Sequence, residues 1–514
     1  MNYKILITTS GIGSRLGELT DFTNKSLIRV GDKPALSHII ENYPENSTFV
    51  ITLGHYGDQV KEFLEMSYPS YDFEFVKVDK YAGTGTSLAY SILQAKDRLQ
   101  CPFVFNACDA ILHDNCLPPE DLQHNFCVGS KVDDSSQYTT LLVNNDQVVE
   151  IKDKGEINYD AAYAGICGIK DYESFWGCLE EAYSSDKNNT CLFEGTVINR
   201  MLPTHKFIYV NTDQWFDMGN TGELEKTRKF FASSVDVLEK KEESIYFFKD
   251  SVVKFFFDKK IVKNRVQRAK RLKHLVPEIE YSGQNFYKYK KMDGILFSKS
   301  VNQKSFLKLL HWSKRNLWIL KQVDNFAPLC RKFYIDKTND RIEQYTKNYE
   351  DSTQVWNGYV VPTAKELLAA VDIEWLCAGR PAQFHGDFIL DNILETEEGF
   401  CLLDWRQDFG GNLEVGDIYY DLAKLNHNLI VNHEIANKGL FVCGDNDCYI
   451  LCNSKLIGCK SILKDFVEDM GLDFKKVETL TSLIWINMAP LHEYPFSKFL
   501  FNFGKYNLTR CIYG

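Results

Sequence analysis

Three polar side chains in the second half of the chain have the types and spacing that phosphoryl transfer requires. In the stretch 385–406, HGDFILDNILETEEGFCLLDWR, Asn392 follows Asp387 by five residues and Asp404 follows Asn392 by twelve. Transfer of a phosphoryl group from ATP needs a carboxylate beside the acceptor hydroxyl, and an amide and a second carboxylate to hold Mg²⁺. Asp387, Asn392 and Asp404 are in the order that this chemistry needs. The spacing therefore predicts a phosphate-transfer site with Mg²⁺ on Asn392 and Asp404.

The elements around these residues are a short loop and then a predicted β-hairpin. The apolar run 400–403, FCLL, leads into Asp404, and a helix is expected to begin near 420–423, YDLA. This stretch resembles the catalytic loop and metal-binding strand of the aminoglycoside phosphotransferase and choline kinase superfamily, which has HGD-x4-N and D-W at these places. The resemblance implies a two-lobed, protein-kinase-like α+β fold with ATP as the donor and Asp387 as the catalytic carboxylate.

The kinase resemblance extends upstream to about residue 240. Two apolar runs, 244–248 and 251–257, predict a hairpin that begins the small lobe. The resemblance places Lys254 on the α- and β-phosphates of ATP, where its usual partner is a glutamate on the next helix. That helix, roughly 260–275, contains no acidic residue, so an edge-strand lysine without a nucleotide role is an equal alternative. The small lobe is expected over about 240–293 and the large lobe over about 294–514.

A second phosphate site is predicted at the amino terminus. The apolar run 3–9, YKILITT, leads into the glycine-rich loop 10–16, SGIGSRL, and the backbone N–H groups of such a loop can approach an anion closely. The basic residues Arg15 and Lys25 follow. Together they resemble the G-x-G-[ST]-R-L…K signature of sugar-phosphate and phosphocholine nucleotidyltransferases. The resemblance implies catalytic roles for Arg15 and Lys25, and nucleotide binding by Gly11, Gly13 and Ser14.

Later segments match the same family in the same order. A second glycine-rich turn lies at 83–88, GTGTSL, and the strand 103–109 ends in Asp109. Open α/β sheets bind ligands at the carboxyl ends of their strands. The segment 215–221, WFDMGNT, resembles the family's W-x-D-x-G-T. The resemblance implies Mg²⁺ on Asp109 and Asp217, nucleotide contacts from Gly83, Gly85 and Ser87, and an acceptor-phosphate contact from Lys154, with Lys152 as the alternative.

The pattern of elements predicts two domains. Strands alternate with helices over the first 230 residues, as in βαβ units, and the resemblance implies a Rossmann-like, GT-A-like mixed sheet. A chain of 514 residues is too long for one hydrophobic core. We therefore predict a nucleotidyltransferase domain over 1–235 and a kinase-like phosphotransferase domain over 236–514. The join at 239–243 is polar, so a cut between about Phe231 and Ser244 is expected to separate two soluble pieces.

The composition excludes several classes of function. The formal net charge of −11 argues against a nucleic-acid-binding surface. No run approaches the 18 apolar residues of a membrane span. The 15 cysteines come without a secretion signal, which favours reduced thiols in a cytoplasmic enzyme.

Two phosphate-handling sites in one chain predict consecutive reactions. The kinase-like domain would phosphorylate a small hydroxyl compound (a sugar, polyol or amino alcohol) with ATP. The first domain would join that phosphate to a nucleotide from a second NTP, with CTP favoured, as an activated precursor for a surface glycan such as capsule or lipopolysaccharide. One alternative is a sugar 1-kinase with a sugar-1-phosphate nucleotidyltransferase that uses UTP, dTTP or GTP. Another is that one domain is a degenerate nucleotide-binding module.

Overall fold

The computed structural model describes residues 2–114, 116–117, 121–233, 240–444, 447–451 and 454–514. The chain forms two compact units. The first comprises Met1–Lys259 with Tyr281–Lys288, and the second comprises Lys260–Glu280 with Tyr289–Gly514. The predicted domain boundary at residues 235 and 236, and residue 239 of the polar join, lie outside the described residues.

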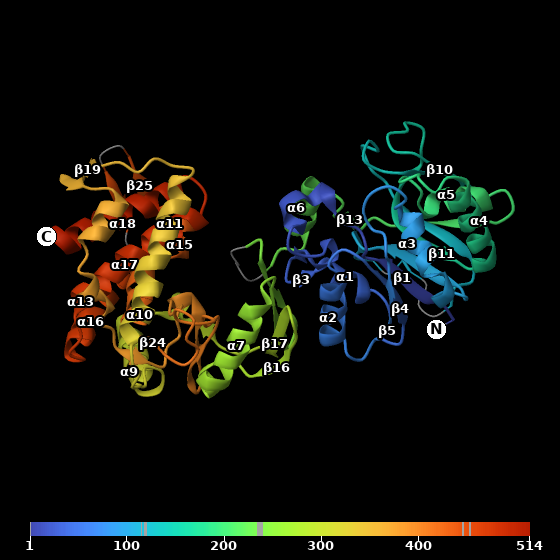
Figure 1. Cartoon of the computed structure of the whole chain (residues 1–514). Helices are drawn as coiled ribbons and strands as arrows, with labels where there is room; N and C mark the ends of the chain where they lie inside the picture. The colour runs from blue at the N-terminus through green and yellow to red at the C-terminus, as the bar shows by residue number, and fades with distance from the viewer. Residues whose placement is uncertain (1, 115, 118–120, 234–239, 445–446, 452–453) are drawn as a thin grey trace. The chain divides into compact units, whose positions relative to one another are not determined.

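A mixed nine-stranded sheet forms the centre of the first unit, with strand order β5-β4-β1-β6-β11-β8-β12-β10-β9 (Figure 1). The strands are β1 (Lys4–Thr8), β4 (Thr48–Leu53), β5 (Asp72–Lys77), β6 (Phe103–Ala107), β8 (Asn125–Ser130), β9 (Thr140–Asn144), β10 (Gln147–Lys152), β11 (Ala161–Ile169) and β12 (Phe207–Asn211). Strands β5, β4, β1 and β6 run parallel, whereas β11 is antiparallel to β6 and β8. The prediction of a mixed α/β sheet is confirmed.

Both faces of this sheet are buried. Ile5 and Ile7 of β1 belong to one apolar cluster and Leu6 to another, because successive side chains of a strand point to opposite faces. The first cluster includes residues of α1 (Ala35–Ile40) and α2 (Gly57–Ser67), and the second includes residues of α3 (Leu88–Gln94), α4 (Tyr172–Ser185) and α5 (Glu194–Met201) (Figure 1). With both faces covered, polar side chains gather at the strand ends.

A short antiparallel pair adjoins the end of β6. Strand β7 (Ala110–Leu112) pairs with β13 (Trp215–Asp217), and α6 (Thr221–Phe230) follows β13. The register sets Asp217 opposite Ala110, so two segments that are far apart in the sequence meet immediately after Asp109.

The strands that the sequence assigned to a kinase small lobe pack into the first unit. A four-stranded sheet of order β14-β15-β17-β16 contains β14 (Glu243–Phe247), β15 (Ser251–Phe256), β16 (Ile279–Ser282) and β17 (Phe286–Lys290). Tyr246 and Phe286 belong to the same apolar cluster as Phe63 of α2. The Glu62 carboxylate accepts hydrogen bonds from the backbone N–H groups of Asn285 at 3.1 Å and Phe286 at 3.0 Å. The predicted hairpin therefore exists, and it shares the hydrophobic core of the first unit.

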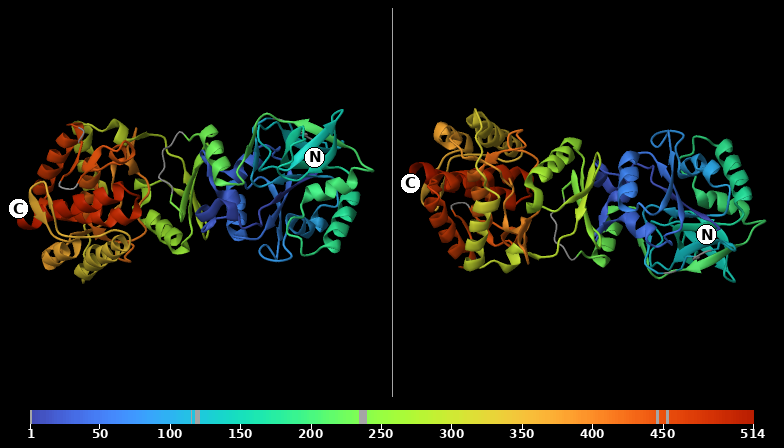
Figure 2. Two further views of the ribbon diagram at one scale, coloured as in Figure 1. Left: turned by 90° about the horizontal axis from the view of Figure 1, so that it is seen from above. Right: turned by 90° about the horizontal axis from the view of Figure 1, so that it is seen from below.

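The second unit is mostly helical, as the orange and red ribbons of Figure 2 show. Its main helices are α7 (Lys259–Leu272), α9 (Gln303–Asn316), α10 (Phe326–Arg331), α11 (Lys337–Thr346), α12 (Ala364–Ala370), α14 (Ile418–Ile430), α16 (Ser454–Asp469), α17 (Phe474–Met488) and α18 (Phe496–Tyr513). The hairpin predicted before Asp404 is confirmed as β22 (Ile393–Thr396) and β23 (Gly399–Leu402). Among the helices in the described ranges, none is both long and apolar enough to cross a membrane.

Candidate active site

The glycine-rich loop after β1 lies directly on Lys25. Gly13 adopts a φ of 75°, and its carbonyl accepts a hydrogen bond from Leu16 N at 2.9 Å at the start of the 3₁₀ turn Ser14–Thr20. A Cβ atom added to Gly13 would lie only 2.9 Å from the Cβ of Lys25. Both the positive φ and this close approach require glycine, so the loop is shaped around the lysine.

Asn24 positions Lys25. The Asn24 carboxamide oxygen accepts from Ser26 N at 2.9 Å, and its nitrogen donates to the carbonyls of Thr9 at 2.8 Å and His55 at 2.6 Å. Asn24 therefore caps the 3₁₀ turn Lys25–Leu27 and ties it to the carboxyl end of β1. Asparagine is a favoured residue for this role because its short side chain reaches the backbone N–H two residues on.

Lys25 forms an ion pair with Asp109. The Lys25 Nζ lies 3.0 Å from Asp109 Oδ2. Burial raises the pKa of the Asp109 carboxyl, but the charge and hydrogen bond of Lys25, together with the Arg15 charge, bring the pKa below its ordinary value. Burial lowers the pKa of Lys25, and Asp109 raises it above its ordinary value. Both groups therefore remain charged at neutral pH.

Asp217 and Arg15 complete this group. Met218 N donates to the Asp109 carbonyl at 3.0 Å, which brings Asp217 to the same place. A Cβ added to Gly219 would lie 3.1 Å from Asp217 Oδ1 and 3.3 Å from Arg15 Nη2, so the guanidinium and the carboxylate flank the same glycine. Burial, and then the Asp109 charge, raise the pKa of Asp217 to about 6. The structure thus brings together Gly13, Arg15, Lys25, Asp109 and Asp217.

The donors in this group fit a magnesium ion. Mg²⁺ is usually held by one or two carboxylates together with the phosphates of a nucleotide. Asp109 and Asp217 are two carboxylates: the Lys25 and Arg15 charges favour the ionised form of Asp109, whereas burial and the Asp109 charge raise the pKa of Asp217. No group of three or more His, Cys, Asp or Glu side chains suited to a metal occurs among the described residues. Two carboxylates suit a metal that arrives with a nucleotide, because the phosphates supply further oxygen ligands.

The predicted nucleotide-binding residues Gly83, Gly85 and Ser87 lie in the second glycine-rich turn, which leads into α3. Gly83 and Gly85 have positive φ values of 86° and 84°, and Ser87 caps α3 by accepting from Tyr90 N at 3.1 Å. The neighbouring Ser91 is hydrogen-bonded to Ser10 of the glycine-rich loop at 2.8 Å between the two Oγ atoms. The second glycine-rich turn therefore leads into a helix that contacts the first loop.

The predicted acceptor-phosphate residue lies apart from these contacts. Lys154 is exposed on the connection between β10 and β11. The alternative, Lys152, is half-buried and donates to the carbonyl of Asn158 at 3.0 Å within the same connection. Among the contacts of the described residues, none joins either lysine to Asp109 or Arg15.

The sequence analysis missed a buried carboxyl group in this unit. Glu194 begins α5, is 2% exposed, and its Oε2 atom has no hydrogen-bond partner among the described residues. Burial raises its pKa to about 7, and the Asp109 charge adds to that rise. The only sequence signal was an acidic residue within the otherwise apolar segment 192–195, LFEG. A carboxyl that titrates near neutral pH is a feature of functional sites.

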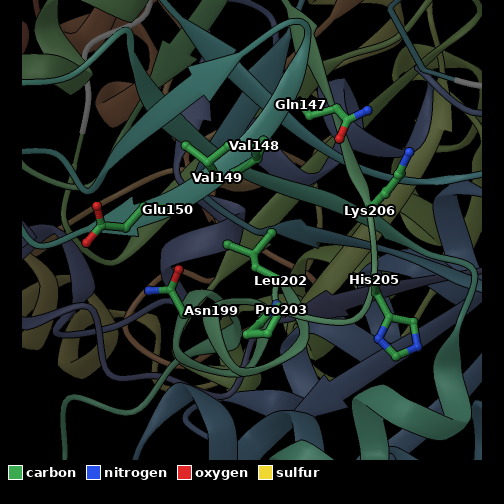
Figure 3. Close-up of a pocket in the computed structure, with 9 residues that line it drawn as sticks. All are labelled: Gln147, Val148, Val149, Glu150, Asn199, Leu202, Pro203, His205 and Lys206. Carbon is green, nitrogen blue, oxygen red and sulfur yellow. The ribbon is translucent and has the colours of Figure 1, made fainter.

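An open pocket lies elsewhere on the first unit (Figure 3). It has a volume of about 550 Å³ between β10 and the segment that follows α5. Its lining residues are Gln147, Val148, Val149, Glu150, Asn199, Leu202, Pro203, His205 and Lys206. It contains none of the predicted site residues.

In the second unit, Asp421 anchors the predicted catalytic loop. Its two carboxylate oxygens accept from His385 N at 2.8 Å and from Gly386 N at 2.7 Å, and Trp318 Nε1 adds a third bond at 3.1 Å. Burial lowers the pKa of His385 to about 4, so the ring is neutral and its Nε2 donates to the Leu403 carbonyl at 2.9 Å. These bonds join the loop to the strand end that carries Asp404.

Asp387 and Asn392 are in direct contact. Asn392 Nδ2 donates to the Asp387 carbonyl at 3.0 Å and to its Oδ2 at 3.2 Å. Lys424 of α14, which the sequence analysis did not select, places its Nζ 2.7 Å from Asp387 Oδ1. Burial raises the pKa of Asp387, whereas the charge and hydrogen bond of Lys424 lower it. The resulting pKa is about 2, below its ordinary value. A carboxylate with so low a pKa is suited to orienting a hydroxyl group rather than to holding its proton.

Asp404 forms an ion pair with Arg265 of α7. It has a positive φ of 54°, an uncommon conformation that often marks functional sites. Its Oδ1 accepts from Arg265 Nη1, and Trp405 Nε1 donates to the Arg265 carbonyl at 2.8 Å. Arg268 donates to the carbonyls of Phe384, His385 and Arg406. The helix that lacks acidic residues therefore binds the catalytic stretch through cations.

The oxygen donors of Asp404 and Asn392 are those that Mg²⁺ prefers. The Arg265 guanidinium contacts one carboxylate oxygen of Asp404, so a metal ion would share this carboxylate with the arginine or displace it. Lys254 is 7% exposed and belongs to the first compact unit, whereas Asp387, Asn392 and Asp404 belong to the second.

Comparison with known proteins gives partial matches. No family model matches the chain. The bifunctional protein GlmU of Methanococcus vannielii is 25% identical over 246 residues, which are 45% of this chain and 55% of that protein. Choline-phosphate cytidylyltransferase of Streptococcus pneumoniae is 30% identical over 106 residues, covering 20% of this chain and 44% of that protein. The chain thus spans about half the length of the curated relatives it matches.

Solved structures give similar coverage. CTP:phosphocholine cytidylyltransferase from Streptococcus pneumoniae shares 19% identity at a TM-score of 0.38, covering 45% of this chain and 99% of that one. The inositol-1-phosphate CTP transferase from T. maritima shares 17% identity at a TM-score of 0.38, covering 45% and 96%. By sequence, the amino-terminal part of the chain resembles sugar-phosphate and phosphocholine nucleotidyltransferases.

Proposed function

We propose that the first unit transfers a nucleotidyl group from an NTP to the phosphate of a small molecule and releases pyrophosphate. The observation that carries this proposal is the group of Arg15, Lys25, Asp109 and Asp217 around the loop at Gly13. It combines backbone N–H groups and two cations for phosphates with two carboxylates for a metal ion. The curated relatives, which include a cytidylyltransferase, support the same reaction class.

The reaction would proceed by direct displacement at phosphorus. An oxygen of the acceptor phosphate attacks the α-phosphorus of the NTP, and the bond to the β-phosphate oxygen breaks. Mg²⁺ bound by Asp109 and Asp217 would neutralise and orient the triphosphate. Lys25, kept charged and fixed by Asn24 and Asp109, would stabilise the charge that develops during the displacement. Arg15 is exposed beside Asp217 and would hold the departing pyrophosphate.

The substrates follow from the resemblance to the relatives. We propose CTP as the nucleotide, with UTP, dTTP and GTP as alternatives, and a sugar, polyol or amino-alcohol phosphate as the acceptor. Lys154 would meet the acceptor phosphate from its exposed connection. The product would be an activated precursor for a surface glycan, made in the cytoplasm, where these triphosphates are available.

Pyrophosphate release tests this proposal. Purified protein is incubated with each of the four NTPs, Mg²⁺ and a panel of sugar 1-phosphates and phosphocholine. We expect release that depends on one NTP and on an acceptor phosphate, and that is lost in Asp109→Asn. Absence of release with every combination would overturn the proposal.

For the second unit we propose phosphorylation of a small hydroxyl compound by ATP. Supporting observations are the contact of Asn392 with Asp387 and the anchoring of their loop by Asp421. Asp387 would orient the acceptor hydroxyl, while Asn392 and Asp404 would hold Mg²⁺, which neutralises the phosphates of ATP. The proposed two-lobed kinase-like domain spans 236–514, with Lys254 of β15 on the α- and β-phosphates.

Mass spectrometry of products distinguishes a kinase from a degenerate binding module. With ATP, Mg²⁺ and a panel of small alcohols, a kinase gives ADP and a product heavier by one phosphoryl group. ATP binding without any product, in a calorimetric titration of the same preparation, would support the binding module instead.

A further inference from the structure

Four basic side chains interact with Asp387, the carboxylate proposed to orient the acceptor hydroxyl, or with one another. They are Lys337 and Arg341 of α11, Arg406 after β23, and Lys424 of α14. All four are half-buried and lie in the second unit. Neither the sequence analysis nor the proposed reaction assigns a role to Lys337, Arg341 or Arg406.

Contacts within the unit bring these cations together. The Lys337 Nζ and the Arg406 Cζ lie 4.9 and 4.8 Å from the centroid of the same ring, Phe333. A Cβ added to Gly386 would lie 2.6 Å from the Cβ of Arg406 and 3.2 Å from its Cδ. The side chain of Arg406 therefore passes beside the residue that precedes Asp387, and Lys337 shares its aromatic support.

Arg341 belongs to the same group. It follows Lys337 by four residues on α11, and residues at this spacing share one helix face. Burial lowers the pKa of Arg341, and the positive charge of Arg406 lowers it further. Burial likewise lowers the pKa of Lys337 well below its ordinary value, followed by the charges of Arg406, Lys424 and Arg341. The cations therefore feel one another's charge.

The carboxylates nearby do not balance this charge. Asp387 is already paired with Lys424 at 2.7 Å. The exposed Asp340 acts on Arg341 and raises its pKa by less than burial and Arg406 lower it. Among the described residues, the side chains of Lys337 and Arg406 both pack on the ring of Phe333. The Nε of Arg406 is buried and has no hydrogen-bond partner among those residues. Half-buried positive charges that act on one another in this way destabilise the folded protein unless an anion binds between them.

We propose that the compound phosphorylated at Asp387 is itself an anion, and that Lys337, Arg341 and Arg406 bind its carboxylate or phosphate group. This inference rests on the proposed phosphorylation and narrows its substrate class to hydroxy acids or phosphorylated alcohols. A cationic acceptor such as choline would be repelled by the same three side chains. Planar guanidinium groups favour carboxylate and phosphate because they can donate two parallel hydrogen bonds.

The transfer step keeps its atoms and charges in balance. The acceptor hydroxyl, oriented by Asp387, attacks the γ-phosphorus of ATP, and the bond from that phosphorus to the β-phosphate oxygen breaks. ADP leaves, and the hydroxyl proton is released to water as the new bond to phosphorus forms, while Asp387 keeps the hydroxyl oriented. The anionic group of the acceptor takes no part in bond making, so Lys337, Arg341 and Arg406 are specificity-determining residues.

Paired probes that differ only in charge test this proposal. Calorimetric titrations of the full chain use glycerate, glycerol 3-phosphate, glycerol and choline, each in the presence of ADP. We expect glycerate or glycerol 3-phosphate to bind at least about tenfold tighter than glycerol, the scale of charge-assisted hydrogen bonds. Arg341→Gln should remove this preference while ATP affinity stays within about twofold. Arg510→Gln, which removes an exposed arginine from the same unit, is the matched control.

Two results would overturn the proposal. One is glycerol or choline binding as tightly as both anions in the wild type. The other is a loss of ATP affinity in Arg341→Gln equal to the loss of anion affinity, which would assign the cations to the nucleotide. ADP release is measured separately. Anion-selective binding that Arg341→Gln abolishes, without ADP release from any probe, would keep the anion site and refute phosphorylation.

Discussion

At the scale of single residues, the first site depends on charges that are paired before any substrate binds. Lys25 and Asp109 hold each other ionised at 3.0 Å, and Asn24 fixes the turn that carries the lysine. Such preorganised groups stabilise a transition state without reorganising during the reaction. A role of this kind predicts an effect on turnover rather than on substrate binding.

Lys25→Ala is therefore expected to lower kcat for nucleotidyl transfer by about 10²-fold or more, with a much smaller change in KM for the NTP. Lys25→Arg should restore little activity, because a planar guanidinium does not replace a compact ammonium in a loop so tight that a Cβ added to Gly13 would lie 2.9 Å from the Lys25 Cβ. Steady-state kinetics and a melting curve on one preparation check this. The control is Lys96→Ala, which breaks the exposed pair with Glu180. A kcat near that of the wild type, with a lowered Tm, would assign Lys25 a structural role only.

The buried Glu194 predicts a dependence of stability on pH. Its pKa is raised from 4.5 to about 7, so the unfolded chain loses this proton at lower pH than the folded chain. The stability it contributes is complete below pH 4.5 and is lost as pH rises through 7. The loss amounts to about 3 kcal/mol. Glu194→Gln cannot ionise, so its stability relative to wild type should increase between pH 5 and pH 8.

Thermal melts of the two proteins at both pH values measure this difference. Glu180→Gln, at an exposed position, is the matched control. A difference between Glu194→Gln and wild type that is the same at pH 5 and pH 8 would show that Glu194 does not titrate in this range.

At the scale of elements, the sheet β14-β15-β17-β16 has two attachments that the sequence could not reveal. Its side chains Tyr246, Val253, Phe255 and Phe286 are at most 1% exposed and lie in the apolar cluster of the first unit. Glu62 of α2 accepts backbone hydrogen bonds from the turn that precedes β17. The polar join at 239–243 was expected to be a place where the chain can be cut. Strands that follow the join nevertheless contribute side chains to the hydrophobic core formed by the residues that precede it.

Fragments that end at different residues test this. A fragment that ends at Phe231 should aggregate or melt at least about 5 °C lower than one that ends at Lys290, because truncating one buried Phe already costs about 3–5 kcal/mol. Solubility and melting curves of fragments 1–231 and 1–290 are compared. Equal Tm values would show that the strands are dispensable to the first unit.

At the scale of the whole molecule, each compact unit contains its own set of phosphate-directed residues. Arg15, Lys25, Asp109 and Asp217 belong to the first unit, and Asp387, Asn392 and Asp404 belong to the second. No residue is shared between the two sets. Two sites with separate residues predict two activities that substitutions can separate.

Asp387→Asn should lower ATP-dependent phosphorylation by at least about 10²-fold, because the acceptor hydroxyl loses its orienting carboxylate. Nucleotidyl transfer to a substrate that already carries its phosphate should continue at the wild-type rate. Asp109→Asn should give the reverse pattern. Coupled assays for ADP and for pyrophosphate measure the two rates, and loss of both activities in either variant would contradict the two-site arrangement.

The sequence by itself determined the types, order and spacing of the polar residues. The G-x-G-S-R-L loop and the aspartates after β6 and within β13 could be recognised because their residue types and order resemble a nucleotidyltransferase signature, and Asp109 also lies at the end of a strand, where open α/β sheets bind ligands. Asp109 and Asp217, 108 positions apart in the chain, were found in this way. Asp387 and Asn392 were found because a short loop keeps them together whatever surrounds it. Residue types and short spacings of this kind can be read directly from the sequence.

Tertiary packing alone decided which charges oppose one another. The sequence shows that the helix over 260–275 has no acidic residue, but only the packing shows that α7 contacts Asp404 through Arg265. Lys337 and Arg406 meet at Phe333 only because a helix and a loop 69 residues apart pack on one ring. Glu194 acquires a raised pKa from burial, and burial is a property of its neighbours. Coulomb and desolvation energies depend on distance and solvent exposure, neither of which spacing along the chain can supply.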